Sequence, residues 1–333
     1  MTIHEANPWK TPLRDLGLTI HGTPLEKVLQ DFQHELNQHG ITRVEPKFYL
    51  STEWGVPFGT ISIAIPFYLA RADLTKLHAK YGGLVEGEGP ADVLRYLRHE
   101  MGHVVNYAYK LYEEAEWVRH FGDINQEYEE EYRPRPFHPD YVRHLPGWYA
   151  QKHPDEDWAE TFAVWLTPGL DWRRRYARAP VALAKLEYCE RTVNILRDRE
   201  PLVVEEELDE DVAAIGSSLD DFYQENVPPG RDAPPEVDEA LQTIFGDLPA
   251  AVDPSAQGRY SAAVLIRRVE HTLATEVYRW TAYFPEHTRV LLRRLAERAE
   301  SMHLSYPAER EADATVALTA FVTALASSFV GRT

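Results

Sequence analysis

The sequence predicts an α+β fold in which a small, edge-exposed sheet packs with helices, followed by an all-α accessory domain. Two short apolar stretches, residues 44–50 and 59–70, have the composition of strands, and segments with helical periodicity surround them. In the last third of the chain the periodicity is helical throughout. We therefore expect a mixed domain over residues 1–200, an acidic, proline-containing linker over 201–235 and a helical domain over 236–333.

The first elements are a helix and two strands. Residues 24–38 have helical periodicity and are followed by Gly40, a residue type common just after helices. The segment 59–70 alternates apolar and small polar residues until Pro66, and proline fits an edge strand better than a central one. We expect an edge strand there, with residues 44–50 as its neighbour; an ordinary core strand is the alternative.

A later helix, expected over residues 91–111, carries the motif His99-Glu100-Met101-Gly102-His103. Residues four apart stand on the same face of a helix, so both imidazoles can reach one metal ion while Glu100 projects beside them. This spacing is typical of the zinc site of metalloproteases. Such a site needs a third protein ligand, which must come from another part of the chain.

A second helix that can supply this ligand is expected over residues 153–166. It opens with a proline and three acids, as the first turn of a helix prefers. Glu156 and Glu160 are four apart and share one face, so either carboxylate can reach the metal. The other side of the helix is apolar and suited to a core, with Trp158, Phe162, Trp165 and Leu166.

The connection between these two helices, residues 112–146, contains an acidic run and several prolines. We expect a long surface loop, and a lid or a removable inhibitory segment is the alternative. Three histidines that flank this connection or lie within it, His120, His144 and His153, are left out of the metal shell because none has a partner at helical spacing. His153 precedes a proline and is expected to mark the start of a helix.

The two segments HEMGH and HPDEDWAETFA resemble a bacterial family of zinc-binding metallopeptidases, within the gluzincin group that holds zinc with two histidines and a glutamate. The resemblance also takes in Phe121-Gly122-Asp123 and Tyr149-Ala150, and it covers roughly residues 45 to 200. It implies a zincin-like catalytic domain, a Zn²⁺ cofactor and an edge strand beside the metal helix that can pair with an extended peptide. Many members carry a zinc ribbon with paired cysteines, which a chain with the single cysteine Cys189 cannot form.

The resemblance leaves two alignments open for the third ligand. Thermolysin-like and lethal-factor-like enzymes have an E-x-x-x-D/E pattern, which makes Glu156 the ligand and leaves Glu160 to hydrogen-bond a ligand histidine; we favour this assignment. Aminopeptidase-like enzymes have an N-E-G-F-A pattern, which makes Glu160 the ligand. The resemblance to lethal-factor-like enzymes also implies that Tyr149 stabilises the oxyanion of the reaction intermediate.

The function predicted from these residues is zinc-dependent peptide hydrolysis, most simply by an endopeptidase. His99, His103 and Glu156 would hold the ion and leave a position open for water, from which Glu100 would take a proton. Two alternatives remain open, namely a zinc-bearing binding or scaffold module without turnover, and a regulatory protease that cuts a single partner protein. The donor set also accommodates manganese, cobalt or iron.

Composition narrows the class of partner. The chain has 333 residues and a formal net charge of −18, which argues against nucleic acid because a basic face is needed to neutralise phosphates. A single cysteine and an N-terminus without a signal-peptide pattern favour a cytoplasmic protein. Residues 314–331 are uncharged but only weakly hydrophobic, so we expect a packed helix and no membrane span. The expected partners are a protein or peptide substrate, with further partner binding or self-association through the C-terminal helices.

Overall fold

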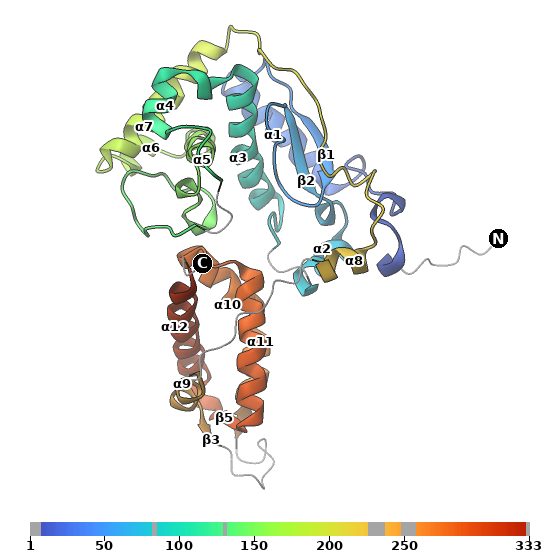
Figure 1. Cartoon of the computed structure of the whole chain (residues 1–333), viewed down its shortest axis with the longest axis vertical. Helices are drawn as coiled ribbons and strands as arrows, with labels where there is room; N and C mark the ends of the chain where they lie inside the picture. The colour runs from blue at the N-terminus through green and yellow to red at the C-terminus, as the bar shows by residue number, and fades with distance from the viewer. Residues whose placement is uncertain (1–7, 82–84, 129–131, 226–236, 248–257, 331–333) are drawn as a thin grey trace, which may run out of the picture. The chain divides into compact units, whose positions relative to one another are not determined.

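The computed structural model divides the chain into two compact units, which are considered separately (Figure 1). The first unit is formed by the described residues up to Glu225, and the second by those from Val237 onward. The described residues are 8–81, 85–128, 132–225, 237–247 and 258–330.

The sheet of the first unit has two parallel strands, β1 (Lys47–Ser51) and β2 (Ser62–Pro66). Their register pairs Lys47 with Ser62 and Ser51 with Pro66. Both strands lie within or next to the stretches predicted from the sequence, although the second is shorter than expected. Pro66 ends it, because a proline has no N–H to donate to a ladder, and residues 67–70 form a 3-10 turn.

The prediction of an exposed edge needs correction. Every residue of β2 is buried, and the Ala64 amide donates a 2.8 Å hydrogen bond to the carbonyl oxygen of Gly55. The loop between the strands therefore folds back over the side of β2 that β1 does not cover. This contact uses one of the backbone groups that the sequence led us to expect free.

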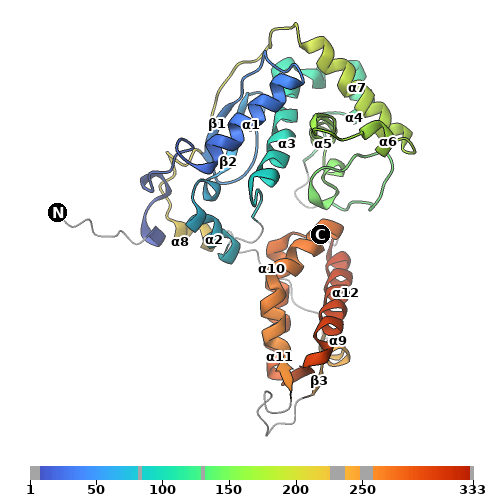
Figure 2. The same cartoon turned by 180° about the vertical axis from the view of Figure 1, so that it is seen from behind.

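The helices of the first unit lie beside this sheet and extend away from it beyond α3 (Figures 1 and 2). Helix α3 (Pro90–Tyr109) contacts α1 (Pro24–Gln38), β2 and α5 (Pro154–Leu166), and α5 in turn contacts α7 (Pro180–Leu196), so α3 lies between the sheet and helices α5 and α7. The side chains between these layers form one apolar core, with Trp117, Trp158 and Phe162 fully buried. The helices are α1 (Pro24–Gln38), α2 (Ala72–Tyr81), α3 (Pro90–Tyr109), α4 (Ala115–Phe121), α5 (Pro154–Leu166), α6 (Trp172–Arg175), α7 (Pro180–Leu196) and α8 (Leu219–Glu225).

Helices predicted from periodicity and end signals are confirmed closely. Both α3 and α5 begin at a proline, whose fixed φ suits the first helical position. The connection between them is less irregular than expected, because residues 115–121 form α4. Within that connection, residues 129–131 lie outside the described part of the chain.

Part of the acidic stretch expected to be a linker packs against the first unit. The amides of Leu202 and Val203 donate to the carbonyl oxygen of Ala108 at the end of α3, at 2.7 and 3.1 Å. Val212 donates to Leu50 of β1 at 3.0 Å, and α8 follows within the same unit. Residues 201–225 therefore belong to the fold of the first unit, and 226–235 lie outside the described residues.

The second unit contains the expected helices and also a small sheet. Its helices are α9 (Val237–Ile244), α10 (Ala262–Thr281), α11 (Pro285–Ser301) and α12 (Glu311–Phe329). Three short strands form an antiparallel sheet in the order β3-β5-β4, with β3 at Gly246–Asp247, β4 at Arg259–Ser261 and β5 at Leu304–Pro307. The prediction of an all-α domain is therefore wrong in this detail. Strands this short have no strong alternation of their own to reveal them.

One described helical segment, Ala308–Phe329, is long and apolar enough to cross a membrane by length and composition, with a mean hydropathy of 1.4. Ala314, Leu318, Val322 and Ala326 of α12 pack into the core of the second unit, as expected for a packed helix. Only 28% of its most apolar window is buried. The expectation that the protein has no membrane partner stays a prediction.

Candidate metal centre

The two helices that carry the motifs cross at a point where no side chain separates their backbones. A Cβ placed on Gly102 of α3 would lie 2.7 Å from the Cα of Ala159 of α5, closer than real Cβ contacts allow. The indole of Trp158 also donates to the Gly102 carbonyl oxygen at 2.8 Å. Glycine and alanine at the crossing thus allow α3 and α5 to approach, and this brings their polar faces together.

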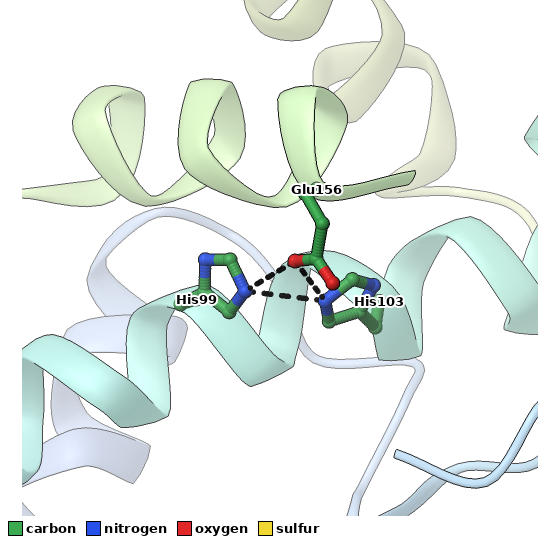
Figure 3. Close-up of side chains that lie close together, drawn as sticks. All are labelled: His99, His103 and Glu156. Carbon is green, nitrogen blue, oxygen red and sulfur yellow. Dashed lines mark hydrogen bonds and ion pairs between the residues drawn. The ribbon is translucent and has the colours of Figure 1, made fainter. Parts of the chain in front are cut away.

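Three side chains from these faces converge at one point (Figure 3). Nε2 of His99 lies 3.0 Å from Oε2 of Glu156 and 3.2 Å from Nε2 of His103. Nε2 of His103 lies 3.3 Å from the same Glu156 oxygen. Two imidazole nitrogens and one carboxylate oxygen therefore form a nearly equilateral triangle, and all three residues are buried.

This triangle fits a zinc ion. Tetrahedral zinc with Zn–N and Zn–O distances of about 2.0–2.1 Å separates neighbouring ligand atoms by roughly 3.3 Å. The three separations given above lie close to this value, from 3.0 to 3.3 Å. Imidazole and carboxylate are also ligand types that zinc takes in catalytic sites, where three protein ligands leave one position open. The three residues can thus hold a metal ion of this kind.

The outer nitrogen of each histidine faces a second carboxylate. Nδ1 of His99 lies 3.1 Å from Oε1 of Glu160, and Nδ1 of His103 lies 3.0 Å from Oδ2 of Asp155. A carboxylate in this position fixes the tautomer and the orientation of a metal-binding imidazole. The two glutamates that the sequence left open thus have different positions. An oxygen of Glu156 is one corner of the triangle, whereas Glu160 contacts the outer nitrogen of His99.

Glu160 is fixed from both sides. Its carboxylate accepts hydrogen bonds from the backbone amides of His144 at 2.7 Å and Leu145 at 3.0 Å, in addition to its contact with His99. Burial alone would raise the pKa of Glu160, but the bond to His99 and the surrounding donors lower it. The Glu160 carboxylate is thus held in its ionised form. It also connects the backbone at His144 and Leu145 to His99 of α3.

Asp155 is a site residue that the sequence analysis missed. Its carboxylate accepts from the side-chain amide of Asn106 at 2.7 Å and from the hydroxyl of Tyr107, as well as facing His103. Burial raises its pKa, but His103 and the hydrogen bonds outweigh this and lower it. The available signal was its place beside Glu156 in the first turn of α5, where three acids made the individual roles indistinguishable.

Residues 65–185 match the model of the family described as "Putative zinc-binding metallo-peptidase". This segment belongs to that family. The match includes the two histidines on α3 and the acids on α5, and it agrees with the resemblance inferred from the sequence. Searches of curated proteins and of solved structures gave no match.

The pKa shifts of the clustered residues follow from the contacts between the histidines and the carboxylates. Burial would lower the pKa of His99, but its contacts with Glu156 and Glu160 raise it to about 9. Likewise, Asp155 and Glu156 outweigh burial and raise the pKa of His103 well above its usual value. The pKa of Glu156 lies well below its ordinary value, because the histidines outweigh its burial. A cation bound at this point would replace protons on the imidazoles.

Glu100, expected to act as the general base, is buried next to the two histidines and lies within the matched residues 65–185. Burial raises the pKa of its carboxyl group, and His99 and His103 oppose this shift only in part. Glu100 does not belong to the triangle of ligand atoms. The pKa of Glu100 is thus shifted in the opposite direction to that of Glu156, whose pKa is lowered by the same two histidines.

Tyr149 lies in the 3-10 segment Pro146–Gln151, where Trp148 has a positive φ of 61°. This left-handed turn, unusual for a bulky residue, precedes Tyr149, whose ring centroid lies 5.5 Å from that of His99. Its hydroxyl lies 3.3 Å from the hydroxyl of Tyr128, a second tyrosine that the sequence analysis missed. Tyr149 is therefore a neighbour of the triangle, in contact with the ring of His99 and with the hydroxyl of Tyr128.

The three histidines that the sequence analysis left out of the metal shell, His120, His144 and His153, also lie outside the triangle. His153 caps α5, with Nδ1 accepting from the Asp155 amide at 3.2 Å and Nε2 facing the Gln126 carbonyl at 3.0 Å. This confirms its expected role at the start of a helix. Nε2 of His144 faces the carbonyl oxygen of Arg95 at 2.9 Å, and His120 lies 3.9 Å from Glu116 on α4.

Proposed function

We propose that this chain is a zinc-dependent metalloprotease with a zincin-like catalytic unit. The observation that supports this most strongly is the convergence of His99, His103 and Glu156 at ligand spacing, with the acid Glu100 buried beside them. The family assigned to residues 65–185 supports the same chemistry. We infer gluzincin-type ligation, with Glu156 as the third ligand.

We assign a separate role in hydrolysis to each residue of the site. A bound zinc ion supplies Lewis acidity, which polarises a peptide carbonyl and lowers the pKa of water to about 7. Glu100 accepts a proton from the attacking water and passes it to the leaving amine. Glu160 and Asp155 hold His99 and His103 in the tautomer that leaves each Nε2 available.

Tyr149 is proposed to stabilise the negative charge that develops on the carbonyl oxygen. Its ring lies beside His99 and its hydroxyl is in contact with Tyr128, which places a phenol group at the side of the site. A hydrogen-bond donor aimed at a developing oxyanion contributes about 3–4 kcal/mol to catalysis. The contact with Tyr128 must break or shift for Tyr149 to serve this purpose.

The wider setting of the activity is also a proposal. We propose an endopeptidase that works on protein or peptide substrates in the cytoplasm, with the second unit as an accessory domain for substrate selection, partner binding or self-association. The single cysteine of the chain, Cys189, is a buried free thiol, which suits a reducing compartment. The acidic chain is not expected to bind nucleic acid.

Hydrolysis of an unfolded protein by the purified, zinc-loaded chain tests the proposal. We expect new peptide ends at internal positions, detected by mass spectrometry, and loss of this activity when a chelator removes the metal. A zinc-loaded chain that binds such substrates without cutting them would favour the binding-module alternative instead. A panel of candidate partner proteins extends the test to a protease with a single substrate.

A further inference from the structure

The two oxygens of the Glu156 carboxylate have different partners. Oε2 faces the two histidines, at 3.0 Å from His99 and 3.3 Å from His103. Oε1 accepts a 2.7 Å hydrogen bond from the hydroxyl of Tyr128. Tyr128 therefore bonds to the carboxylate oxygen that is not the one facing the two histidines.

This bond determines the direction of the hydrogen bond between Tyr128 and Tyr149. A tyrosine hydroxyl has one proton, and Tyr128 donates its proton to Glu156. The contact of 3.3 Å between Tyr128 and Tyr149 must then use the proton of Tyr149. The three groups form a short chain in which Tyr149 donates to Tyr128 and Tyr128 donates to the carboxylate.

The ring of Tyr128 is held in place by the residues that begin α5. The ammonium group of Lys152 lies 4.3 Å from the ring centroid, and the ring of His153 lies 5.3 Å away. Two residues earlier, the Gln126 carbonyl oxygen faces Nε2 of His153 at 3.0 Å. The segment before Tyr128 is thus tied to the helix that carries Glu156, and the hydroxyl has a defined direction.

We propose that Tyr128 is a positioning residue of the metal centre, which holds the Glu156 carboxylate so that one oxygen alone is presented to the ion. This inference rests on the proposed zinc site. Without the phenol, the carboxylate would be free to turn and offer both oxygens. It would also lose a charge-assisted hydrogen bond that fixes its orientation. Tyr128 would therefore set both the affinity for zinc and the coordination number.

The test compares Tyr128→Phe with wild type and with Tyr109→Phe. The hydroxyl of Tyr109 donates to a backbone oxygen, that of Arg199, at 3.1 Å, so the control also removes one phenol hydrogen bond from the same unit. Zinc affinity is measured by competition with a chelator, and the Co²⁺-substituted proteins are compared by visible absorption. Thermal unfolding of the metal-free proteins checks the fold, which is expected to survive because Tyr128 is 44% exposed.

We expect Tyr128→Phe to weaken zinc binding by about 10–100-fold, as loss of a group that orients a ligand typically does. We also expect its cobalt band to change in intensity, because the released oxygen can enter the coordination sphere. Tyr109→Phe should match wild type in both. Wild-type affinity and an unchanged cobalt band in Tyr128→Phe would overturn this inference and leave the zinc site standing. Failure of the wild type itself to bind zinc would instead overturn the proposed function.

Discussion

Gly102 and Ala159 bring the backbones of α3 and α5 together, since a Cβ on Gly102 would lie 2.7 Å from the Cα of Ala159. This contact sits one residue before His103 and three residues after Glu156. It explains why the motif contains a glycine in the middle of a helix, where glycine costs about 1 kcal/mol relative to alanine. The distance between the two ligand-bearing helices depends on it.

Gly102→Ala should therefore destabilise the first unit despite its better helix propensity. The added methyl group meets backbone, which cannot move aside as a flexible side chain can, and overpacking of this kind costs about 1–3 kcal/mol. We expect a melting temperature lower by several degrees and weaker zinc binding. Gly55→Ala is the control, because its Cβ would meet nothing within 4 Å. Equal stability of the two variants would contradict the close approach.

Asp155→Asn tests the support of His103. An asparagine keeps the size of the side chain but removes the charge that faces Nδ1 of His103 at 3.0 Å. We expect zinc affinity, measured by chelator competition, to fall by about 10–100-fold. Asp171→Asn removes an exposed charge at the start of α6 and should leave the affinity unchanged, since asparagine also caps helices. Wild-type zinc affinity in Asp155→Asn would show that the contact with His103 does not contribute to metal binding.

Glu100→Gln separates metal binding from turnover. Glutamine has nearly the same shape but cannot accept the proton, so we expect the rate of hydrolysis to fall by at least about 10²–10⁴-fold while zinc content stays at the wild-type level. Glu88→Gln, an exposed residue just before α3, is the matched control. Hydrolysis at the wild-type rate by Glu100→Gln would show that another group is the general base.

Tyr149→Phe tests the proposed oxyanion donor. Loss of such a donor should lower kcat by about 10²–10³-fold with little change in zinc content. Because the Tyr149 hydroxyl contacts Tyr128, whereas Tyr128 donates to Glu156 itself, metal binding should depend on Tyr149 much less than on Tyr128. A loss of less than about threefold in kcat would exclude the role in catalysis, since a missing oxyanion donor costs far more.

The helices and the metal-binding motif were predictable because their signals are local. His99 and His103 are on one face by helical spacing alone, and Pro154 with the acids that follow it marks the start of α5. The short strands β3, β4 and β5 were missed because two to four residues show no alternation. Residues 201–225 resemble a linker in composition, yet backbone hydrogen bonds to β1 and α3 hold the segment in the fold.

The roles of individual acids needed the three-dimensional structure. Spacing puts Glu156 and Glu160 on one face, but the crossing of α3 and α5 decides which of them meets both Nε2 atoms. Asp155 and Tyr128 were missed because their partners, His103 and Glu156, are 52 and 28 residues away in the sequence. Contacts of this range depend on packing and carry no local pattern.

Metal analysis of the purified protein tests the central claim most directly. The account predicts one zinc ion per chain in the wild type, loss of that ion in Glu156→Ala, and weakened binding in Glu160→Ala, where the ion is still held by His99, His103 and Glu156. A wild type without metal after zinc is added back would contradict the zinc site. Full zinc content in Glu156→Ala together with its loss in Glu160→Ala would contradict the assignment of the third ligand.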